Sequence, residues 1–420
     1  MKQIITIFLS LFFGAVLTID AQTKYVGGDI SVLQSYEDNN VAYYDMNGTK
    51  IDDVLQYMKG SDVGWNAQRV RLFVNPTRKA PDGSTDAQVC QDLDYVKRLA
   101  KRIKEEGFAL MLDFHYSDTW ADPANQWTPA EWLSLSDEEL ATKVYEYTKE
   151  CLQELVAVGA TPDFIQPGNE ISYGMLWGAY GTKANRCYTS NDANWDRFRT
   201  LLGQAILACR EVCPQAKIII HTERAGNWST TRGIYERLAS VDYDIIGLSY
   251  YPFWHNSLSV LASTLNQLAS NFPDKRVQIV ETAYYYQWQP NDVSYDFSSI
   301  WSISPEGQKA FTQDLITELK KHANVDGLFW WFPEENGNGP NSKVLTNWVN
   351  RGLWDDNTHR ALPALYVLKD FLDEQTGIHE ATIGNTSISD GIFTIDGKQV
   401  SKDQMTTGLY IVNGKKTMLR

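Results

Sequence analysis

The chain of 420 residues contains little cysteine and little histidine, and acidic residues outnumber basic ones. Its five cysteines are odd in number and form no Cys-x-x-Cys pair or His-containing metal spacing, so the sequence predicts neither a disulfide framework nor a zinc site. No Gly-x-Gly-x-x-Gly or Walker-type phosphate loop occurs, which argues against a nucleotide-binding fold. The 38 basic and 52 acidic residues give a formal charge of -14, and such a surface does not attract nucleic acid or an anionic membrane.

Long hydrophobic runs are also missing, except within residues 1–18. There one lysine precedes an apolar run, which predicts a secretory signal peptide over 1–21 that ends near Ala21. Ile19 departs from the small residue preferred three positions before the cleavage site, so a retained N-terminal anchor is the alternative. The first cysteine is Cys90, so a lipoprotein anchor is not expected. We therefore expect a secreted protein, periplasmic or extracellular, with no membrane span in the mature chain.

Buried, strand-like stretches alternate with amphipathic helical patterns along most of the remaining chain. This alternation predicts an α/β fold, namely a (β/α)8 TIM barrel over 22–377, and an open doubly wound sheet is the main alternative. The expected strands are 24–31, 68–74, 108–115, 164–165, 216–222, 243–250, 277–282 and 325–331. The expected helices include 86–106, 136–158, 195–213, 306–322 and 362–372.

Polar and aromatic side chains stand at or near the ends of the predicted strands. In a (β/α)8 barrel the loops that follow the strands form the active face, so these side chains are expected to meet at one site. They are Asp29, Arg71, His115, Glu170, His221, Tyr250, Glu281 and Trp331.

Two of the predicted strands lead into glutamate. The turn at Pro167-Gly168 presents Asn169 and Glu170, and another strand ends at Glu281. One such glutamate would be an ordinary surface residue, but a pair suits acid/base and nucleophilic chemistry on a sugar acetal. The 14 Trp and 22 Tyr agree with that interpretation, because aromatic faces form platforms for sugar rings.

Four motifs carry a resemblance to a known family. They stand in the order Asp113–Pro123, Gln166–Glu170, Ser249–Trp254 and Ile279–Thr282. Over most of the chain, from about 27 to 372, the sequence resembles the arabinogalactan endo-β-1,4-galactanases of glycoside hydrolase family 53. The resemblance implies a (β/α)8 barrel that cleaves β-1,4-galactan internally with retention of configuration.

The same resemblance implies roles for individual residues. Glu170 would be the acid/base and Glu281 the nucleophile. Glu170 must then start protonated and Glu281 ionised, and we expect Arg71 with the hydroxyl of Tyr250 or Tyr251 to favour the ionised form of Glu281. The expected substrate-binding residues are Asp29, Arg71, His115, Trp120, Asn169, Trp177, His221, Tyr250, Tyr251 and Trp331.

Cofactors and partners follow from the resemblance as well. No cofactor and no catalytic metal are expected, and the partner is galactan or galacto-oligosaccharide bound by a monomer. Some bacterial relatives carry structural calcium, to which Asp355–Asn357 could contribute, although EF-hand spacing is absent. Departures such as Phe73 in place of a common Trp bear on subsite contacts. Two alternatives stay open: a related hydrolase acting on another β-1,4-glycan (mannan or glucan), and a non-catalytic sugar-binding barrel.

The character of the sequence changes in the last stretch, 378–420, where 383–420 lacks helical periodicity. It contains two hairpin-like pieces, 392–400 and 408–419, with turns expected at Asp396-Gly397 and Asn413-Gly414. The segment resembles the short C-terminal tail of secreted proteins from Bacteroidetes-type bacteria. It is too short for a robust core of its own, and whether it sorts, docks or is vestigial stays open.

Overall fold

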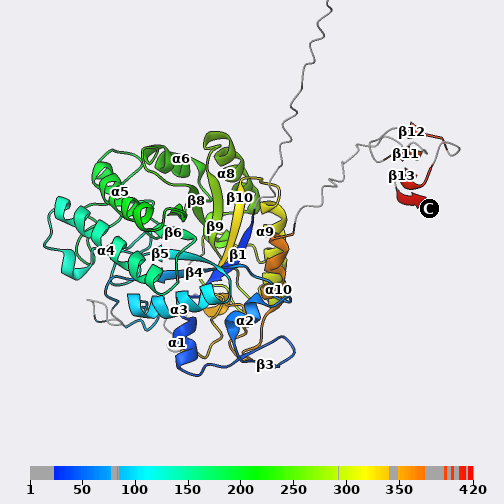
Figure 1. Cartoon of the computed structure of the whole chain (residues 1–420), viewed down its shortest axis with the longest axis horizontal. Helices are drawn as coiled ribbons and strands as arrows, with labels where there is room; N and C mark the ends of the chain where they lie inside the picture. The colour runs from blue at the N-terminus through cyan, green and yellow to red at the C-terminus, as the bar shows by residue number, and fades with distance from the viewer. Residues whose placement is uncertain are drawn as a thin grey trace, which may run out of the picture. The chain divides into compact units, whose positions relative to one another are not determined.

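Eight parallel strands close into a barrel in the computed structural model (Figure 1). The structure describes residues 23–76, 83, 85–291, 293–339, 349–373, 392–394, 399–401, 406–412 and 415–419. The strands follow one another around the barrel in sequence order, and β1 closes the ring by pairing with both β4 and β10. The predicted (β/α)8 barrel is therefore confirmed. Its strands are β1 (Tyr25–Asp29), β4 (Ala67–Leu72), β5 (Ala109–Phe114), β6 (Phe164–Pro167), β7 (Lys217–Thr222), β8 (Ile245–Tyr250), β9 (Arg276–Thr282) and β10 (Val325–Trp331).

Helices surround the barrel and bury their apolar stripes against the strands (Figure 1). The longest, α4, begins at a capping box in which the Ser136 hydroxyl accepts the Glu139 N–H and the Glu139 carboxylate accepts the Ser136 N–H. The helices are α1 (Leu33–Asp38), α2 (Val54–Lys59), α3 (Leu93–Glu105), α4 (Asp137–Ala157), α5 (Trp195–Val212), α6 (Trp228–Arg237), α7 (Pro252–His255), α8 (Leu258–Asn271), α9 (Pro305–Leu319) and α10 (Pro363–Val367).

The predicted start of the helix at 86 is wrong. Helix α3 begins at Leu93, where the Asp92 side chain accepts the Tyr95 N–H at 2.8 Å and caps the first turn. Asp86 lies in the preceding loop, and its carboxylate accepts the Trp120 indole N–H at 2.6 Å. The helix therefore begins after the Asp92 cap, and Asp86 belongs to the loop before it.

Inside the barrel, the side chains of β4 change from apolar to charged along the strand. Side chains alternate along a strand, so Ala67, Arg69 and Arg71 of β4 all face the interior. Toward the amino ends of the strands the interior is a small apolar core, whereas the charged side chains lie toward the carboxyl ends. This core comprises Ala67, Met111, Phe164, Ile219, Ile245, Val280 and Phe329.

The C-terminal segment forms a second compact unit, 374–420, separate from the unit 1–373. Its strands are β11 (Ile392–Thr394), β12 (Gln399–Val400), β13 (Gly408–Val412) and β14 (Lys415–Leu419), which form an antiparallel sheet in the order β12-β11-β13-β14. The predicted hairpin-like strands are present, and the residues expected at their turns lie outside the described part. The segment 1–21, expected to be a signal peptide, also lies outside it. Among the described residues, no helix has the length and hydrophobicity needed to cross a membrane.

Candidate active site

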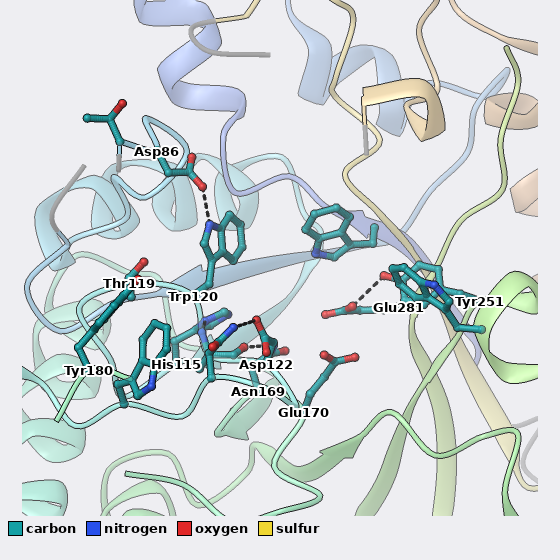
Figure 2. A pocket seen from close by; sticks show the side chains of 16 residues that line it. Asp86, His115, Thr119, Trp120, Asp122, Asn169, Glu170, Tyr180, Tyr251 and Glu281 are labelled. Carbon is teal, nitrogen blue, oxygen red and sulfur yellow. Dashed lines mark hydrogen bonds between the residues drawn. The ribbon is translucent and has the colours of Figure 1, made fainter. Parts of the chain in front are cut away.

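A cleft of about 430 Å³ opens over the carboxyl ends of the strands (Figure 2). Glu170 and Glu281 face each other in it, as the barrel architecture predicts for residues at strand ends. The lining residues are Thr85, Asp86, His115, Thr119, Trp120, Ala121, Asp122, Asn125, Trp127, Asn169, Glu170, Tyr180, Tyr251, Trp254, Glu281 and Trp331.

A sharp turn after β6 carries Glu170 into the cleft. Gly168 has φ +112°, and a Cβ at that position would lie 2.6 Å from the Ile171 side chain, so glycine is required there. Glu170 itself has φ +48°, a left-handed conformation that a non-glycine residue rarely adopts. Such local strain is typical of a side chain whose position matters for function.

The environment of Glu170 favours its protonated form. Burial raises its pKa well above the usual value, and the nearby carboxylates of Glu281 and Glu223 raise it further. Ser249 Oγ lies 2.6 Å from Glu170 Oε1 as its hydrogen-bond partner. A carboxyl group that stays protonated at neutral pH can act as a general acid.

The environment of Glu281 favours its ionised form by comparison. The Tyr251 hydroxyl donates to Oε2 at 2.8 Å, and Arg69 Nη2 lies 3.1 Å from Oε1. Burial raises the pKa of Glu281 to about 7, while Arg69 and Tyr251 hold it down. A single proton shared by the pair therefore resides on Glu170.

The two carboxyl groups lie close enough together for a retaining pair. One oxygen of Glu170 lies within 4.8 Å of an oxygen of Glu281. Retaining glycosidases hold their carboxyls about 5–5.5 Å apart, whereas inverting enzymes leave room for a water molecule between them.

The cation beside the nucleophile candidate is Arg69, and the expectation that Arg71 fills this place is not met. Arg69 is fully buried and contacts Asp29 Oδ2 at 2.6 Å and Asp113 Oδ2 at 2.8 Å as well as Glu281. Arg71 contacts Asp29 Oδ1 at 3.2 Å, and its guanidinium lies 4.4 Å from the centroid of the Trp120 ring. Both arginines face the barrel interior, so alternation alone does not decide which one reaches Glu281.

Most of the expected substrate-binding residues lie in the cleft or next to it. His115 lines the cleft, with Nε2 3.1 Å from Asp113 Oδ2 and Nδ1 accepting the Ala121 N–H at 3.1 Å. Trp120 and Trp331 also line it, with ring centroids 6.3 Å apart. Those that line the cleft are His115, Trp120, Asn169, Tyr251 and Trp331. Arg71 lies against the Trp120 ring, and Asp29 contacts Arg69 and Arg71.

Asp29 and Arg71 are thus outside the cleft lining, and so are three further expected substrate-binding residues, Trp177, Tyr250 and His221. Trp177 is fully buried and donates its indole N–H to the Tyr173 carbonyl at 2.9 Å. The Tyr250 hydroxyl donates to the Asn256 carbonyl at 2.9 Å. His221 is fully buried beneath Glu170 and contacts neighbouring side chains. The geometry favours Tyr251 over Tyr250 as the partner of the nucleophile candidate, because side chains alternate at the end of β8.

Comparison with known proteins decides the family. The sequence profile of Glycosyl hydrolase family 53 matches residues 25–368. The chain belongs to this family. A probable arabinogalactan endo-beta-1,4-galactanase A of Aspergillus terreus is 34% identical over 328 residues, covering 74% of this chain and 86% of that protein. The GH53 catalytic domain of Ignisphaera aggregans has a TM-score of 0.70 at 30% identity and covers 83% of this chain and 96% of its own. A structure from a study of two fungal beta-1,4-galactanases has a TM-score of 0.67 at 30% identity, covering 83% of this chain and 99% of its own.

This family 53 barrel also places in its cleft aromatic residues that were not predicted. Trp127 and Tyr180 come from two different loops, and their ring centroids lie 3.9 Å apart on the cleft wall. In Figure 2, Tyr180 and Tyr251 lie at opposite ends of the lining. The sequence signals were the Trp-rich loop after β5 and the long loop after β6, but neither says which ring faces the cleft.

Glu170, His221 and Glu281 also have the spacing of a possible cation site, with one ligand atom from each within 4.8 Å of the others. Their contacts argue against that use. The Arg69 guanidinium already lies against Glu281, and both His221 nitrogens face hydrogen-bond partners. The Asp355 carboxylate, considered above for calcium, caps a turn by accepting the Thr358 N–H at 2.7 Å. Calcium binding there stays a prediction.

Proposed function

We propose that this protein is an endo-acting, retaining β-1,4-galactanase that degrades galactan side chains of pectin. The observation that carries the proposal is the pair Glu170 and Glu281 in a family 53 barrel, with one oxygen of each within 4.8 Å of the other and the pKa of Glu170 raised more than that of Glu281. Relatives named as arabinogalactan endo-beta-1,4-galactanases support the substrate class. A cleft open over the barrel end accommodates an internal segment of a polymer.

In the first half of the reaction, a Glu281 oxygen attacks the anomeric carbon while Glu170 donates its proton to the glycosidic oxygen. The bond between the anomeric carbon and that oxygen breaks, and the leaving chain departs as an alcohol. Arg69 and the Tyr251 hydroxyl hold the attacking carboxylate in place through the contacts at 3.1 and 2.8 Å. Asn169 Nδ2 donates to the Ala121 carbonyl at 2.7 Å and has a second hydrogen for the sugar 2-hydroxyl.

In the second half, the glycosyl ester of Glu281 no longer carries a charge. The like-charge contribution to the raised pKa of Glu170 then disappears, so the ionised Glu170 can take a proton from water. The hydroxide attacks the anomeric carbon, the ester bond breaks, and Glu281 leaves as a carboxylate. Two inversions at one carbon give net retention.

Product analysis tests the substrate and the nucleophile together. Wild type and Glu281→Ala are incubated with linear galactan, mannan and cellulose, with Glu150→Gln, an exposed change on α4, as the control. We expect short galacto-oligosaccharides of β configuration from wild type and the control, and a loss of at least about 10³-fold in Glu281→Ala. Cleavage of mannan or cellulose instead would assign another β-1,4-glycan, and binding without cleavage would assign a sugar-binding barrel.

Azide separates the two carboxylate roles. In Glu170→Ala, azide attacks the glycosyl-enzyme without needing a base, so activity on an activated aryl β-galactobioside returns with a β-galactosyl azide product. In Glu281→Ala, no covalent intermediate forms, so azide gives at most an α-configured product. An exchange of these two outcomes would reverse the assignment.

The proposal extends to the compartment. We propose that residues 1–21 direct export and that the mature protein acts as a monomer outside the cytoplasm. The apolar run in 1–18 supports export, and polymeric galactan is met outside the cytoplasm. N-terminal sequencing of protein recovered from the periplasm and the medium tests the cleavage, and light scattering tests the monomer.

A further inference from the structure

A line of hydrogen-bonding groups runs from Glu170 into the barrel wall. Ser249 Oγ lies 2.6 Å from Glu170 Oε1 and 2.8 Å from His221 Nε2. On the other side of the imidazole, His221 Nδ1 lies 3.0 Å from Asn169 Oδ1. Ser249 and His221 are fully buried and absent from the cleft lining, so they meet the substrate only through Glu170 and Asn169.

The orientation of Asn169 determines which nitrogen of His221 carries the proton. Arg69 Nη2 donates to Asn169 Oδ1 at 2.9 Å, and Asn169 Nδ2 donates to the Ala121 carbonyl at 2.7 Å. The atom that faces His221 Nδ1 is therefore a carbonyl oxygen, which requires a hydrogen on Nδ1. The Glu170 N–H also points at Nδ1, but at 3.4 Å it lies beyond the usual hydrogen-bond range and does not outweigh this contact.

The charge of His221 follows from its surroundings. Burial and the Arg69 guanidinium lower the pKa of His221 well below its usual value, so the imidazole is neutral. With its one hydrogen on Nδ1, the ring presents a lone pair at Nε2. The Ser249 hydroxyl then donates to Nε2, and its oxygen can only accept a hydrogen from Glu170.

We propose that His221 and Ser249 are positioning residues that keep Glu170 protonated before the first step and let it ionise for the second. While His221 Nε2 accepts the Ser249 hydrogen, that hydrogen is turned away from Glu170. Only protonated Glu170 can then form a hydrogen bond with Ser249 Oγ, by donating its own hydrogen. Once Glu170 gives up its proton, rotation about the Ser249 Cβ–Oγ bond brings the hydroxyl hydrogen to the carboxylate. One hydroxyl thus serves both halves of the reaction. This inference rests on the proposed function, because it takes Glu170 as the acid/base, whereas the hydrogen-bond geometry does not depend on that role.

Other charged groups around Glu170 act on the same equilibrium. Glu281 at the end of β9, Glu223 after β7 and Asp122 in the loop after β5 all raise the pKa of Glu170. These contributions do not depend on the tautomer of His221. A change at His221 should therefore move the pKa of Glu170 without returning it to that of a free carboxyl.

Two variants of His221 test the proposal through the pH profile. Among the described residues, the Ser249 hydroxyl faces His221 Nε2 and Glu170 Oε1, so in His221→Leu it donates to the Glu170 carboxylate and lowers the pKa of Glu170. The alkaline limb of kcat/KM on galactan should move down by about one pH unit or more. His221→Gln can offer a carbonyl to Ser249 and an amide N–H to Asn169, so its limb should stay in place. With an aryl β-galactobioside whose leaving group needs no proton, both variants should match wild type in the alkaline range.

A second substitution separates this route from general damage to the fold. In a Ser249→Ala background, His221→Leu should no longer move the alkaline limb, because the hydroxyl that carries the effect is absent. An unchanged limb in His221→Leu alone, or an equal shift in the Ser249→Ala background, would overturn the proposal.

The tautomer can be measured without any substrate. Nitrogen-15 NMR of histidine-labelled protein resolves protonated from unprotonated imidazole nitrogens, and His221→Gln identifies the signals of His221 among the six histidines. We expect a protonated Nδ1 and an unprotonated Nε2 across the active pH range. A protonated Nε2, or an imidazolium, would overturn the proposal even if galactan is the substrate. The expected tautomer without galactan cleavage would overturn only the proposed function.

Discussion

Arg69 Nη2 lies 3.1 Å from Glu281 Oε1, inside a group in which one guanidinium serves three carboxylates. The other two are Asp29 and Asp113, at 2.6 and 2.8 Å. Burial alone would lower the pKa of Arg69, but the nearby carboxylates raise it overall. Asp29 and Asp113 also compete with Glu281 for the positive charge of Arg69. The nucleophile candidate is therefore oriented firmly but neutralised only in part, which agrees with its pKa of about 7.

Replacing Arg69 with lysine should damage the site although the charge is kept. Lysine cannot reproduce the forked contacts to Asp29, Asp113 and Glu281, so buried carboxylates lose hydrogen bonds. We expect kcat on galactan to fall about 100-fold, and the melting temperature to fall as well. Arg232→Lys, in an exposed ion pair with Glu236, is the control that should change neither. Full activity in Arg69→Lys would mean that Glu281 needs no oriented cation.

Removing the Tyr251 hydroxyl should shift the acidic limb of the pH profile. Its donated hydrogen bond at 2.8 Å stabilises ionised Glu281, so in Tyr251→Phe the pKa of Glu281 rises. The acidic limb of kcat/KM should move to higher pH, and the maximal rate should fall about 10- to 100-fold. Tyr250→Phe makes the same change one residue earlier, where the hydroxyl faces the Asn256 carbonyl, and should leave the limb in place. Equal shifts in both variants would refute this assignment.

The Trp127 and Tyr180 pair should affect how polymers bind and leave the chemistry alone. Their rings lie 3.9 Å apart on the cleft wall, where a sugar ring could stack. In Trp127→Ala we expect KM for galactan to rise about 10-fold and the lengths of the released oligosaccharides to change. Trp127→Phe keeps an aromatic face, so its KM should lie between those of wild type and Trp127→Ala. Chromatography of the products over time measures the lengths, and an unchanged pattern would place the substrate elsewhere.

The buried Glu334 carboxyl group should lower the free energy of unfolding at neutral pH. It is fully buried after β10: Oε1 accepts the Val32 N–H at 2.9 Å, and Oε2 has no hydrogen-bond partner among the described residues. Burial, with the charge of Asp29, raises its pKa well above the usual value. Because the folded state holds this proton more tightly than the unfolded state, stability is highest below the unfolded pKa and falls as pH rises toward the folded pKa.

Glu334→Gln removes this titration and keeps an acceptor for the Val32 N–H. The stability gained by the variant should be near zero at pH 4 and grow with pH by up to about 1.4 kcal/mol per unit. Urea unfolding of both proteins at several pH values measures it. Parallel stability curves across that range would show that Glu334 titrates alike in both states.

The spacing of apolar residues was enough to predict the strands and to place the two glutamates at strand ends. The predicted strand 325–331 agrees with β10, and the helix expected at 195–213 agrees with α5 within one residue. Such agreement arises because a buried strand or a half-buried helix needs a particular spacing of apolar residues. The spacing does not reveal where a loop ends and a helix begins, so α3 begins later than predicted.

The sequence by itself determined the order of the strands, the strand-end location of Glu170 and Glu281, and the motifs typical of family 53. Only the tertiary structure decided that Arg69 contacts Glu281, that Tyr251 and not Tyr250 reaches it, and that Trp177 is buried. The reason is physical. A sequence pattern records which face of a strand or helix a side chain occupies, whereas a hydrogen bond depends on where side chains from different strands meet when the barrel closes.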